Sequence, residues 1–359
     1  MATIYDVAKV AGVSPKTVSR VVNGDGPVGT KTREAVNAAI ATLRYVPSNA
    51  ARMMRSNKSE LIGLITGAIS LSSEPAQPAG LPDLFIVQGI QSALANSGMT
   101  LMIADTGGRS DRVPHLIQTF LQHRVEGLIY VAEHHQRVTL PKIPQDVQMV
   151  LANCYDDIGT SAILPDDKRG QHDLVARLID AGHQRIGYLT LRDDTDADRL
   201  RREGYCAALK AADIPYDPVL VATCELPGNV DEAQLLRDTI DRMLLLPDPP
   251  TVLCCGNDKM AVRVYGILRS RGVKVPDEMA VAGYDNYRVI SETLYPPLTT
   301  VDLPYSAMGV HAAQRLMALI SGEGRDDRTP TLVVGPVCWR ESVRNLRPAN
   351  VTNLTQQED

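Results

Sequence analysis

The sequence lacks the features that mark membrane proteins and secreted proteins. No apolar run reaches the roughly 18 residues that a membrane span needs. Asp6 and Lys9 interrupt the N-terminal segment in which a signal peptide would carry its apolar core. We therefore expect a cytoplasmic protein without membrane contact, and its 359 residues suit about two to three domains.

The sequence also lacks the motifs of common enzymes and metalloproteins. It contains no G-x-S-x-G, H-E-x-x-H or Walker motif, and its adjacent aspartates, such as Asp156-Asp157, point apart. We expect no enzymatic activity, no metal and no cofactor. The six cysteines show no metal-ligand spacing, and we interpret them as buried thiols in a reducing compartment. They are Cys154, Cys206, Cys224, Cys254, Cys255 and Cys338.

The charge is distributed unevenly along the chain. Residues 1–58 carry nine Lys and Arg against three Asp and Glu, a net charge of +6. Because the whole chain carries −5, residues 59–359 carry −11. A basic N-terminal segment on an acidic body is typical of a headpiece that binds a polyanion, and DNA binding should be confined to it.

The basic segment carries the signals of three short helices. Apolar residues at helical spacing over 4–11 end at Gly12, and Ser14 followed by Pro15 is a strong helix start. A second helix is predicted from Pro15 to about Val22 and a third over 31–43. The G-x-G-x-x-G pattern at 24–29 follows a helix rather than a strand, so it is a loop and not a nucleotide-binding turn. Two short helices joined by a tight turn predict a helix-turn-helix, whose second helix enters the DNA major groove.

The exposed face of the second helix suits DNA recognition. Lys16 and Arg20 can donate to guanine O6 and N7, and hydroxyl and amide groups can donate to phosphate oxygens. The alternative is a merely solvated helix face. The candidate DNA-binding residues are Tyr5, Ser14, Pro15, Lys16, Thr17, Ser19, Arg20, Asn23, Thr32, Tyr45, Asn49, Ala51, Met54 and Arg55.

A hinge helix is predicted after the head. Pro47 ends the third helix, and Ser48 can cap a short helix that runs to about Arg55. Such a helix is too short to be stable alone, so it should order against DNA or a partner copy. Met54 is suited to a wedge between base steps in the minor groove. The alternative is a linker whose methionine packs on the body.

These stretches carry a family signature. The head closely resembles the headpiece of the lactose-repressor (LacI/GalR) family of bacterial transcription regulators, and the resemblance continues to about Val343. It implies a homodimer that reads the two halves of a palindromic operator in double-stranded DNA, with paired hinge helices. Three departures, Gly29, Arg44 and Met54, should alter cap strength and hinge packing rather than function. The matching stretches are Ile4-Tyr5-Asp6-Val7-Ala8, Ala11-Gly12-Val13-Ser14, Thr17-Val18-Ser19-Arg20-Val21-Val22-Asn23-Gly24 and Tyr45-Val46-Pro47.

Short apolar runs alternate with helical patterns in the rest of the chain. Strands are predicted at 61–65, 100–104, 127–131, 185–191, 220–223, 252–255 and 280–283, and helices at 85–96, 114–123, 200–212, 233–245 and 259–271. This alternation predicts α/β lobes with parallel, doubly wound sheets, whose ligands bind beyond the carboxyl ends of the strands.

The resemblance implies two lobes like those of periplasmic sugar-binding proteins, with three chain crossings between them. We expect these crossings near Thr160, Ile290 and Gly324. The predicted fold is therefore α/β, with a helix-turn-helix head and hinge helix before a two-lobed sensor. The expected domains are 1–46 (head), 47–59 (hinge), 60–343 (sensor; N-terminal lobe about 60–160 plus 291–324, C-terminal lobe about 161–290 plus 325–343) and 344–359 (polar tail).

Polar residues that follow predicted strands are candidates for effector binding. Asn153, Asn257 and Asp285 lie at strand ends, and Arg201 lies early in a helix. Amide, carboxylate and guanidinium groups that converge on one cleft suit a polyol. Singly, each of these residues has a plain structural alternative as a turn or helix cap. The resemblance implies that Arg201, Asn257 and Asp285 occupy effector positions of the family.

Phe85, Glu133 and His134 are further candidates from the first lobe. Phe85 is expected to face either the ligand or the core, and Glu133 and His134 follow a predicted strand but have the alternative of ordinary surface residues. We expect a mono- or disaccharide, such as sucrose or another glucoside. The alternatives are a purine or phosphorylated ligand, or a sugar-binding transport protein. The polar tail lacks apolar heptads, which predicts a dimer rather than a tetramer.

Overall fold

The computed structural model describes residues 2–46, 58–67, 81–225, 231–323 and 328–347, and the statements below concern these residues. The chain divides into two compact units. One contains the residues up to Leu61 together with Arg124–Glu126, and the other contains the remainder. We call residues 2–46 the head and the described residues from Ile62 onward, other than Arg124–Glu126, the body.

The head consists of three helices around a small core. They are α1 (Ile4–Ala11), α2 (Pro15–Asn23) and α3 (Thr30–Leu43). Val7, Val18 and Val36, one from each helix, are fully buried and belong to one apolar cluster. These are the inward positions that the helical spacing predicts, so the three predicted helices are confirmed.

Local caps define the first two helices of the head. The Ser14 hydroxyl accepts a hydrogen bond from the backbone N–H of Thr17 at 3.2 Å, which confirms the predicted N-cap of α2. Thr3 and Asp6 form a reciprocal capping box at the start of α1. Gly12 ends α1 with φ +65°, the left-handed conformation that glycine adopts without strain.

The third helix has weaker ends, as two of the departures from the family pattern predict. Gly29 at its N-cap has no side chain to accept a hydrogen bond from the first turn. Arg44 at its C-cap has φ +47°, a left-handed conformation that is strained for a residue with a Cβ. Both ends of α3 therefore lack the residue types that stabilise such positions best.

The N-terminal lobe of the body contains a six-stranded sheet in the order β11-β5-β4-β3-β1-β2. The four pairs from β1 to β11 are parallel, and the register of β3 on β4 shifts between Val131 and Gln136. The strands are β1 (Leu61–Thr66), β2 (Thr100–Asp105), β3 (Gly127–Arg137), β4 (Gln148–Tyr155), β5 (Ala162–Pro165) and β11 (Thr331–Val333).

The C-terminal lobe contains a second six-stranded sheet in the order β12-β10-β9-β8-β6-β7. Its pairs are parallel except for β10 with β12, which is antiparallel. The strands are β6 (Ile186–Thr190), β7 (Val221–Thr223), β8 (Val252–Cys255), β9 (Ala280–Asp285), β10 (Thr299–Asp302) and β12 (Val337–Cys338). The predicted doubly wound α/β fold is confirmed.

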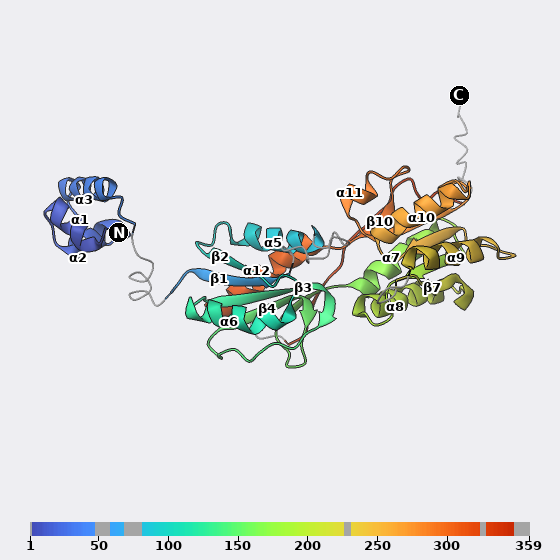
Figure 1. Cartoon of the computed structure of the whole chain (residues 1–359), viewed down its shortest axis with the longest axis horizontal. Helices are drawn as coiled ribbons and strands as arrows, with labels where there is room; N and C mark the ends of the chain where they lie inside the picture. Colours follow the sequence, from blue (N-terminus) through green and yellow to red (C-terminus); the bar gives the residue numbers. More distant parts are fainter. Residues whose placement is uncertain (1, 47–57, 68–80, 226–230, 324–327, 348–359) are drawn as a thin grey trace, which may run out of the picture. The chain divides into compact units, whose positions relative to one another are not determined.

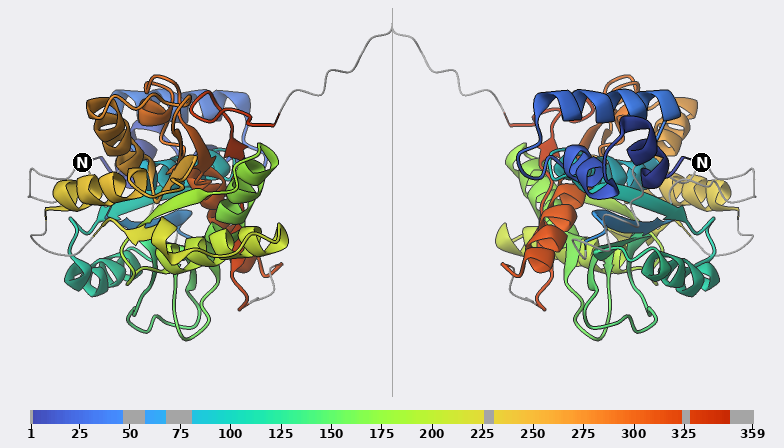
Figure 2. Two further views of the ribbon diagram at one scale, coloured as in Figure 1. Left: turned by 90° about the vertical axis from the view of Figure 1, so that its right-hand side faces the viewer. Right: turned by 90° about the vertical axis from the view of Figure 1, so that its left-hand side faces the viewer.

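Helices cover both faces of each sheet (Figures 1 and 2). In the N-terminal lobe α5 and α12 share a core with β1, β3 and β4, whereas α6 places Phe120 against Gly63 on the opposite face. In the C-terminal lobe α7 and α8 cover one face and α9 and α10 the other. The helices are α5 (Leu81–Leu94), α6 (Val113–Gln122), α7 (Asp167–Asp180), α8 (Asp196–Ala211), α9 (Glu232–Leu244), α10 (Asp258–Ser270), α11 (Arg288–Ser291) and α12 (Tyr305–Ser321), with 3-10 turns η1 (Ser110–Arg112) and η2 (Pro218–Leu220).

Two glycines allow α5 and α12 to approach each other closely. A Cβ on Gly309 would lie 2.1 Å from the carbonyl oxygen of Ile86, and a Cβ on Gly89 would lie 2.1 Å from the carbonyl oxygen of Ser306. Both contacts are with backbone, which cannot rotate away. This packing holds α5 beside the segment that carries the chain from one lobe to the other.

The expected positions of the three lobe crossings are wrong. β5 belongs to the first sheet and β10 to the second, so the chain crosses after Pro165 rather than near Thr160, and after Asp302 rather than near Ile290. The third crossing lies between Val333 and Val337 rather than near Gly324. The reason is that β5, β10, β11 and β12 have only two to four residues each, too few for a periodic signal.

Three smaller expectations also need correction. The expected elements do not include α7 and α12. The polar tail does not begin at Arg344, because His183 Nε2 lies 3.1 Å from the Arg344 carbonyl oxygen and the Leu346 N–H donates to the Ala181 carbonyl. Cys206 is exposed and Cys338 half-buried, whereas the other four cysteines are buried as expected.

Candidate functional site

The exposed face of α2 presents basic and hydroxyl side chains. Lys16 and Arg20 are exposed, and the first turn of α2 contains no acidic residue. The hydroxyls of Ser14 and Thr17 lie 2.9 Å apart. Asn23 Nδ2 donates to the carbonyl oxygen of Ser19 at 2.6 Å. Donors and positive charge therefore lie along one side of this helix.

The remaining head candidates differ in exposure, and Tyr45 packs against the core of the head. Tyr5 is 71% exposed, whereas Pro15, Thr32 and Tyr45 are half-buried. Four hinge candidates, Asn49, Ala51, Met54 and Arg55, lie outside the described residues, as does the predicted hinge helix.

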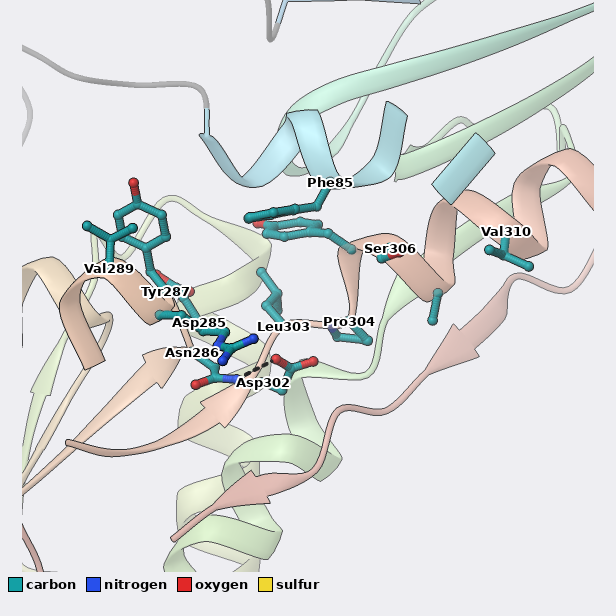
Figure 3. Close-up of a pocket in the computed structure, with 13 residues that line it drawn as sticks. Phe85, Asp285, Asn286, Tyr287, Val289, Asp302, Leu303, Pro304, Ser306 and Val310 are labelled. Atoms are coloured by element: carbon teal, nitrogen blue, oxygen red, sulfur yellow. Dashed lines mark hydrogen bonds between the residues drawn. The ribbon is translucent and has the colours of Figure 1, made fainter. Parts of the chain in front are cut away.

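A cavity of about 560 Å³ lies within the body, lined by residues of both lobes (Figure 3). Phe85 of α5 is 42% exposed and faces across the cavity toward Asp285, Asn286 and Asp302. Two of the predicted effector residues, Phe85 and Asp285, thus lie at one cavity. The lining residues are Phe85, Asp285, Asn286, Tyr287, Arg288, Val289, Asp302, Leu303, Pro304, Tyr305, Ser306, Ala307 and Val310.

The backbone after β9 is strained where it borders the cavity. Asp285 has φ +114° and Asn286 has φ +51°, conformations that cost energy for residues other than glycine. Hydrogen bonds hold them: the Leu303 N–H donates to the Asp285 carbonyl at 3.2 Å, and Asn286 Nδ2 donates to Asp302 Oδ1 at 2.8 Å. These hydrogen bonds therefore hold the backbone segment that carries Asp285.

Asp258 supports the same segment from behind. This residue is fully buried, and its carboxylate accepts hydrogen bonds from the Thr300 hydroxyl at 2.7 Å and from the Tyr287 N–H at 2.8 Å. Burial and the nearby negative charge of Asp285 raise the pKa of Asp258. Burial likewise raises the pKa of Asp285, although Arg201 opposes the shift. Two acidic groups thus lie close together at the end of β9.

Arg201 of α8 is buried beside these acids, 4% exposed. Its Nε donates to Asp167 Oδ1 at 2.7 Å, and its Nη1 donates to the Gly256 carbonyl at 2.6 Å. The guanidinium carbon lies 3.6 Å from the centre of the Tyr284 ring. Nη2 lies 4.0 Å from Asp285 Oδ1. Arg201 and Asp285 are therefore brought together, as predicted, although Arg201 does not itself line the cavity.

Two contacts from the N-terminal lobe reach this network. His135 Nδ1 lies 2.9 Å from the second oxygen of Asp167, and the Tyr155 hydroxyl donates to Asp196 Oδ2 at 2.9 Å. Burial alone would raise the pKa of Asp167, but Arg201 and the hydrogen bond from His135 lower it. None of these four residues was among the candidates predicted from the sequence. Glu133 and His134 were named instead because the strand was predicted to end at Val131, whereas β3 continues to Arg137.

The other candidates lie elsewhere and do not line this cavity. Asn257 caps α10, its Oδ1 accepting from the Met260 N–H at 2.8 Å. Asn153 is buried with φ +60°, and its Nδ2 donates to the Ala132 carbonyl at 3.1 Å. Glu133 and His134 are exposed. Asn257 thus has the role of a helix cap that was its alternative, whereas Asn153 lies within β4 and bonds to β3, as neither a turn nor a helix cap.

The described part of the chain contains no cluster of His, Cys, Asp and Glu suited to holding a metal ion. Among its helices, none combines the length and apolar character required to cross a membrane.

Comparison with known proteins identifies both parts of the chain. Residues 3–48 match the model of "Bacterial regulatory proteins, lacI family", and residues 175–343 match the "Periplasmic binding protein-like domain". The ribose operon repressor of Escherichia coli (strain K12) is 34% identical over 327 residues, covering 89% of this chain and 94% of the relative. The sucrose operon repressor of Escherichia coli is 30% identical over 342 residues, covering 95% and 99% respectively.

The fold agrees with a solved structure of the same kind. The lac repressor dimer bound to operator and the anti-inducer ONPF superposes with a TM-score of 0.76 at 27% identity, covering 96% of this chain and 99% of that one. The lacI-family head excludes a sugar-binding transport protein, and the relatives are transcriptional repressors rather than enzymes. The chain belongs to the lacI family of bacterial regulatory proteins, as a DNA-binding regulator with an effector-binding domain.

Proposed function

We propose that this protein is a cytoplasmic repressor whose affinity for a palindromic operator is controlled by a small carbohydrate. The observation that carries the proposal is the cavity with the aromatic ring of Phe85 on one side and the carboxylates of Asp285 and Asp302 on the other. Its volume of about 560 Å³ falls within the range of small-molecule sites. The relatives' names, ribose and sucrose operon repressors, agree with a sugar as effector.

The chemistry of the cavity fits a polyol. Vicinal hydroxyl groups donate well to carboxylate oxygens, and Asp285 and Asp302 offer these. The apolar face of a sugar ring can lie against Phe85. Arg201, 4.0 Å from Asp285, completes the effector site when a ligand displaces the local packing. We keep Asn153, Asn257, Glu133 and His134 as outer candidates that a closed arrangement of the lobes would bring to the ligand.

The head supplies the DNA-reading half of the proposal. We propose that α2 enters the major groove, with Lys16 and Arg20 donating to base edges and Ser14, Thr17, Ser19 and Asn23 donating to the backbone. A homodimer would place two heads on the two halves of a palindrome. The hinge over 47–59 would then pair in the minor groove.

Regulation follows from a difference in ligand affinity between two arrangements of the lobes. A sugar can change operator affinity only by binding one arrangement more tightly than the other. We propose that it thereby moves the N-terminal lobes of the dimer and either pairs or melts the hinge helices. Relief of repression is the expected direction.

Thermal unfolding of the full-length protein with a ligand panel tests the effector class. A ligand present at about 100 times its Kd should stabilise the native state by about 2.7 kcal/mol. We expect a sugar such as ribose, sucrose or another glucoside to raise the Tm and to change operator affinity. A shift with a purine only would replace the carbohydrate in the proposal. Operator affinity that does not change with the stabilising ligand would contradict the regulatory scheme.

A further inference from the structure

A buried positive charge close to the cavity residue Asp285 is already neutralised inside the protein. Arg201 uses Nε for Asp167 at 2.7 Å and Nη1 for the Gly256 carbonyl at 2.6 Å. Its remaining nitrogen, Nη2, lies 4.0 Å from a second carboxylate, that of Asp285. A ligand that reaches Arg201 therefore meets a guanidinium whose charge is balanced by two acids.

The other arginines around the cavity are paired as well. Arg288 Nε and Nη2 donate to the two oxygens of Glu292 at 2.7 and 3.3 Å. Arg340 donates to Asn286 Oδ1 at 2.9 Å and to the Leu298 carbonyl at 2.8 Å, and lies 3.7 Å from Glu292. Lys259 acts on Asp285, whose pKa its charge lowers. Each of these cations, all within the described residues, thus already acts on an acid or a carbonyl group.

The acidic groups, by contrast, face the cavity directly. Asp285 and Asp302 both line it, and Asp258 lies behind them. Burial raises the pKa of Asp285 even with Arg201 nearby, because its charged form loses solvation by water. A phosphate group in this cavity would lie against two carboxylates. The nearby cations, the exposed Arg288 and the buried Arg201, are already paired with Glu292 and Asp167.

We propose that this cavity selects uncharged polyhydroxyl ligands and rejects their phosphate esters, and that Asp167 is the residue that sets this selectivity. The inference rests on the proposed carbohydrate site and deepens it. Asp167 acts through Arg201 and is therefore a positioning residue.

Asp167 is suited to this role because it is held from both lobes. The residue is 1% exposed, one oxygen binds Arg201, and the other binds His135 at 2.9 Å. Since Arg201 and His135 lower its pKa, it stays ionised at neutral pH. An uncharged amide at this position would leave the charge of Arg201 available to an anionic ligand.

Calorimetric titration of the full-length protein with matched sugar pairs tests the proposal. Ribose and ribose 5-phosphate, glucose and glucose 6-phosphate, and sucrose and sucrose 6-phosphate differ only by the phosphate. For the pair that binds, we expect the phosphate ester to bind on the order of 100-fold more weakly than the free sugar. An ester that binds as tightly as the free sugar overturns the proposal but leaves the carbohydrate function standing.

The variant Asp167→Asn separates charge selection from steric exclusion of the phosphate. It should reduce the ratio of the Kd of the ester to the Kd of the sugar by on the order of 10-fold, because Arg201 then keeps a net charge. Asp157→Asn, at an acid whose side chain is 73% exposed, is the matched control and should leave this ratio of Kd values unchanged. An unchanged ratio of Kd values in Asp167→Asn would show that the shape of the cavity, and not its charge, excludes the ester.

A second variant covers the case in which Asp167→Asn fails to fold. Asp302→Asn removes a charge that lines the cavity and leaves Arg201 and its partners unchanged. It should also reduce the ratio of the Kd of the ester to the Kd of the sugar. If no member of any pair binds wild-type protein while a purine does, the proposed function itself is wrong, and this inference is lost with it.

Discussion

The head and the body satisfy their polar groups in different ways. Side-chain hydrogen bonds in the described head join residues three or four positions apart, as in Ser14 with Thr17 and Asn23 with Ser19. In the body the decisive bonds span long distances in sequence: Arg201 binds Asp167, 34 positions away, and Gly256, 55 positions away. Helix caps and turns can therefore be predicted from a short stretch of sequence. A ligand cavity depends instead on residues that only folding brings together.

We expect the largest effect from a substitution that breaks the long-range hydrogen bonds of Arg201 in the body. Arg201→Ala leaves Asp167 buried without its main cation, which should destabilise the body by about 3–5 kcal/mol and abolish the ligand response. Denaturant unfolding and operator binding with and without ligand measure both effects. Arg199→Ala, an exposed arginine on the same helix, is the control and should cost about 1 kcal/mol or less. Equal effects of the two variants would contradict the assigned role of Arg201.

A second prediction concerns packing between distant helices. Gly309→Ala places a Cβ 2.1 Å from the Ile86 carbonyl oxygen, so α12 must move away from α5 at a cost of about 1–3 kcal/mol. Gly266→Ala on α10 is a matched control, because its Cβ would meet nothing within 4 Å. That change should stabilise the helix by about 0.5–1 kcal/mol. Opposite signs in denaturant unfolding are the expected result.

A third prediction addresses the DNA-reading face of the head. Arg20→Ala should weaken binding to an operator selected from random DNA by about 1–3 kcal/mol, while ligand binding is unchanged. Binding to random duplex should fall less, because the lost contact is to a base. Arg33→Ala, an exposed arginine on α3, is the comparison. Loss of both specific and random binding to the same extent would indicate a phosphate contact instead.

We expect the smallest effect from a substitution at the C-terminal cap of α3, which tests the local interactions of the head. Arg44→Gly removes a Cβ from a residue with φ +47° and should stabilise the end of α3 by about 1 kcal/mol. Ala35→Gly, in the interior of the same helix, introduces the same residue at an ordinary helical position and should destabilise it by about 1 kcal/mol. Hydrogen exchange of the α3 amides in the full-length protein measures both changes.

Sequence patterns predicted the structure correctly where the signals are short-range. The helices of the head, the Ser14 cap and the weak ends of α3 were predicted because each depends on residues within one turn. The alternating strands and helices also predicted the two sheets. The lobe crossings were misplaced because strands such as β11, with three residues, leave too little pattern to recognise.

The candidate effector site was predicted only in part. Asp285, named because it lies at the end of a predicted strand, and Phe85, named as a candidate from the first lobe, both line the cavity. His135 and Asp167 were missed because nothing in either neighbourhood points to the other, 32 positions away. Asn257 was a candidate for effector binding, but the sequence could not distinguish that role from a helix cap, because both have the same local sequence.

By itself the sequence determined the basic head, its three helices and the alternation that builds two α/β lobes, because caps and hydrophobic periodicity act over a few residues. Only the tertiary structure decided which acids neutralise Arg201, where the chain crosses between lobes, and which side chains line the cavity. Electrostatic pairing depends on distance in space, and folding alone brings Asp167, Arg201 and Asp285 together.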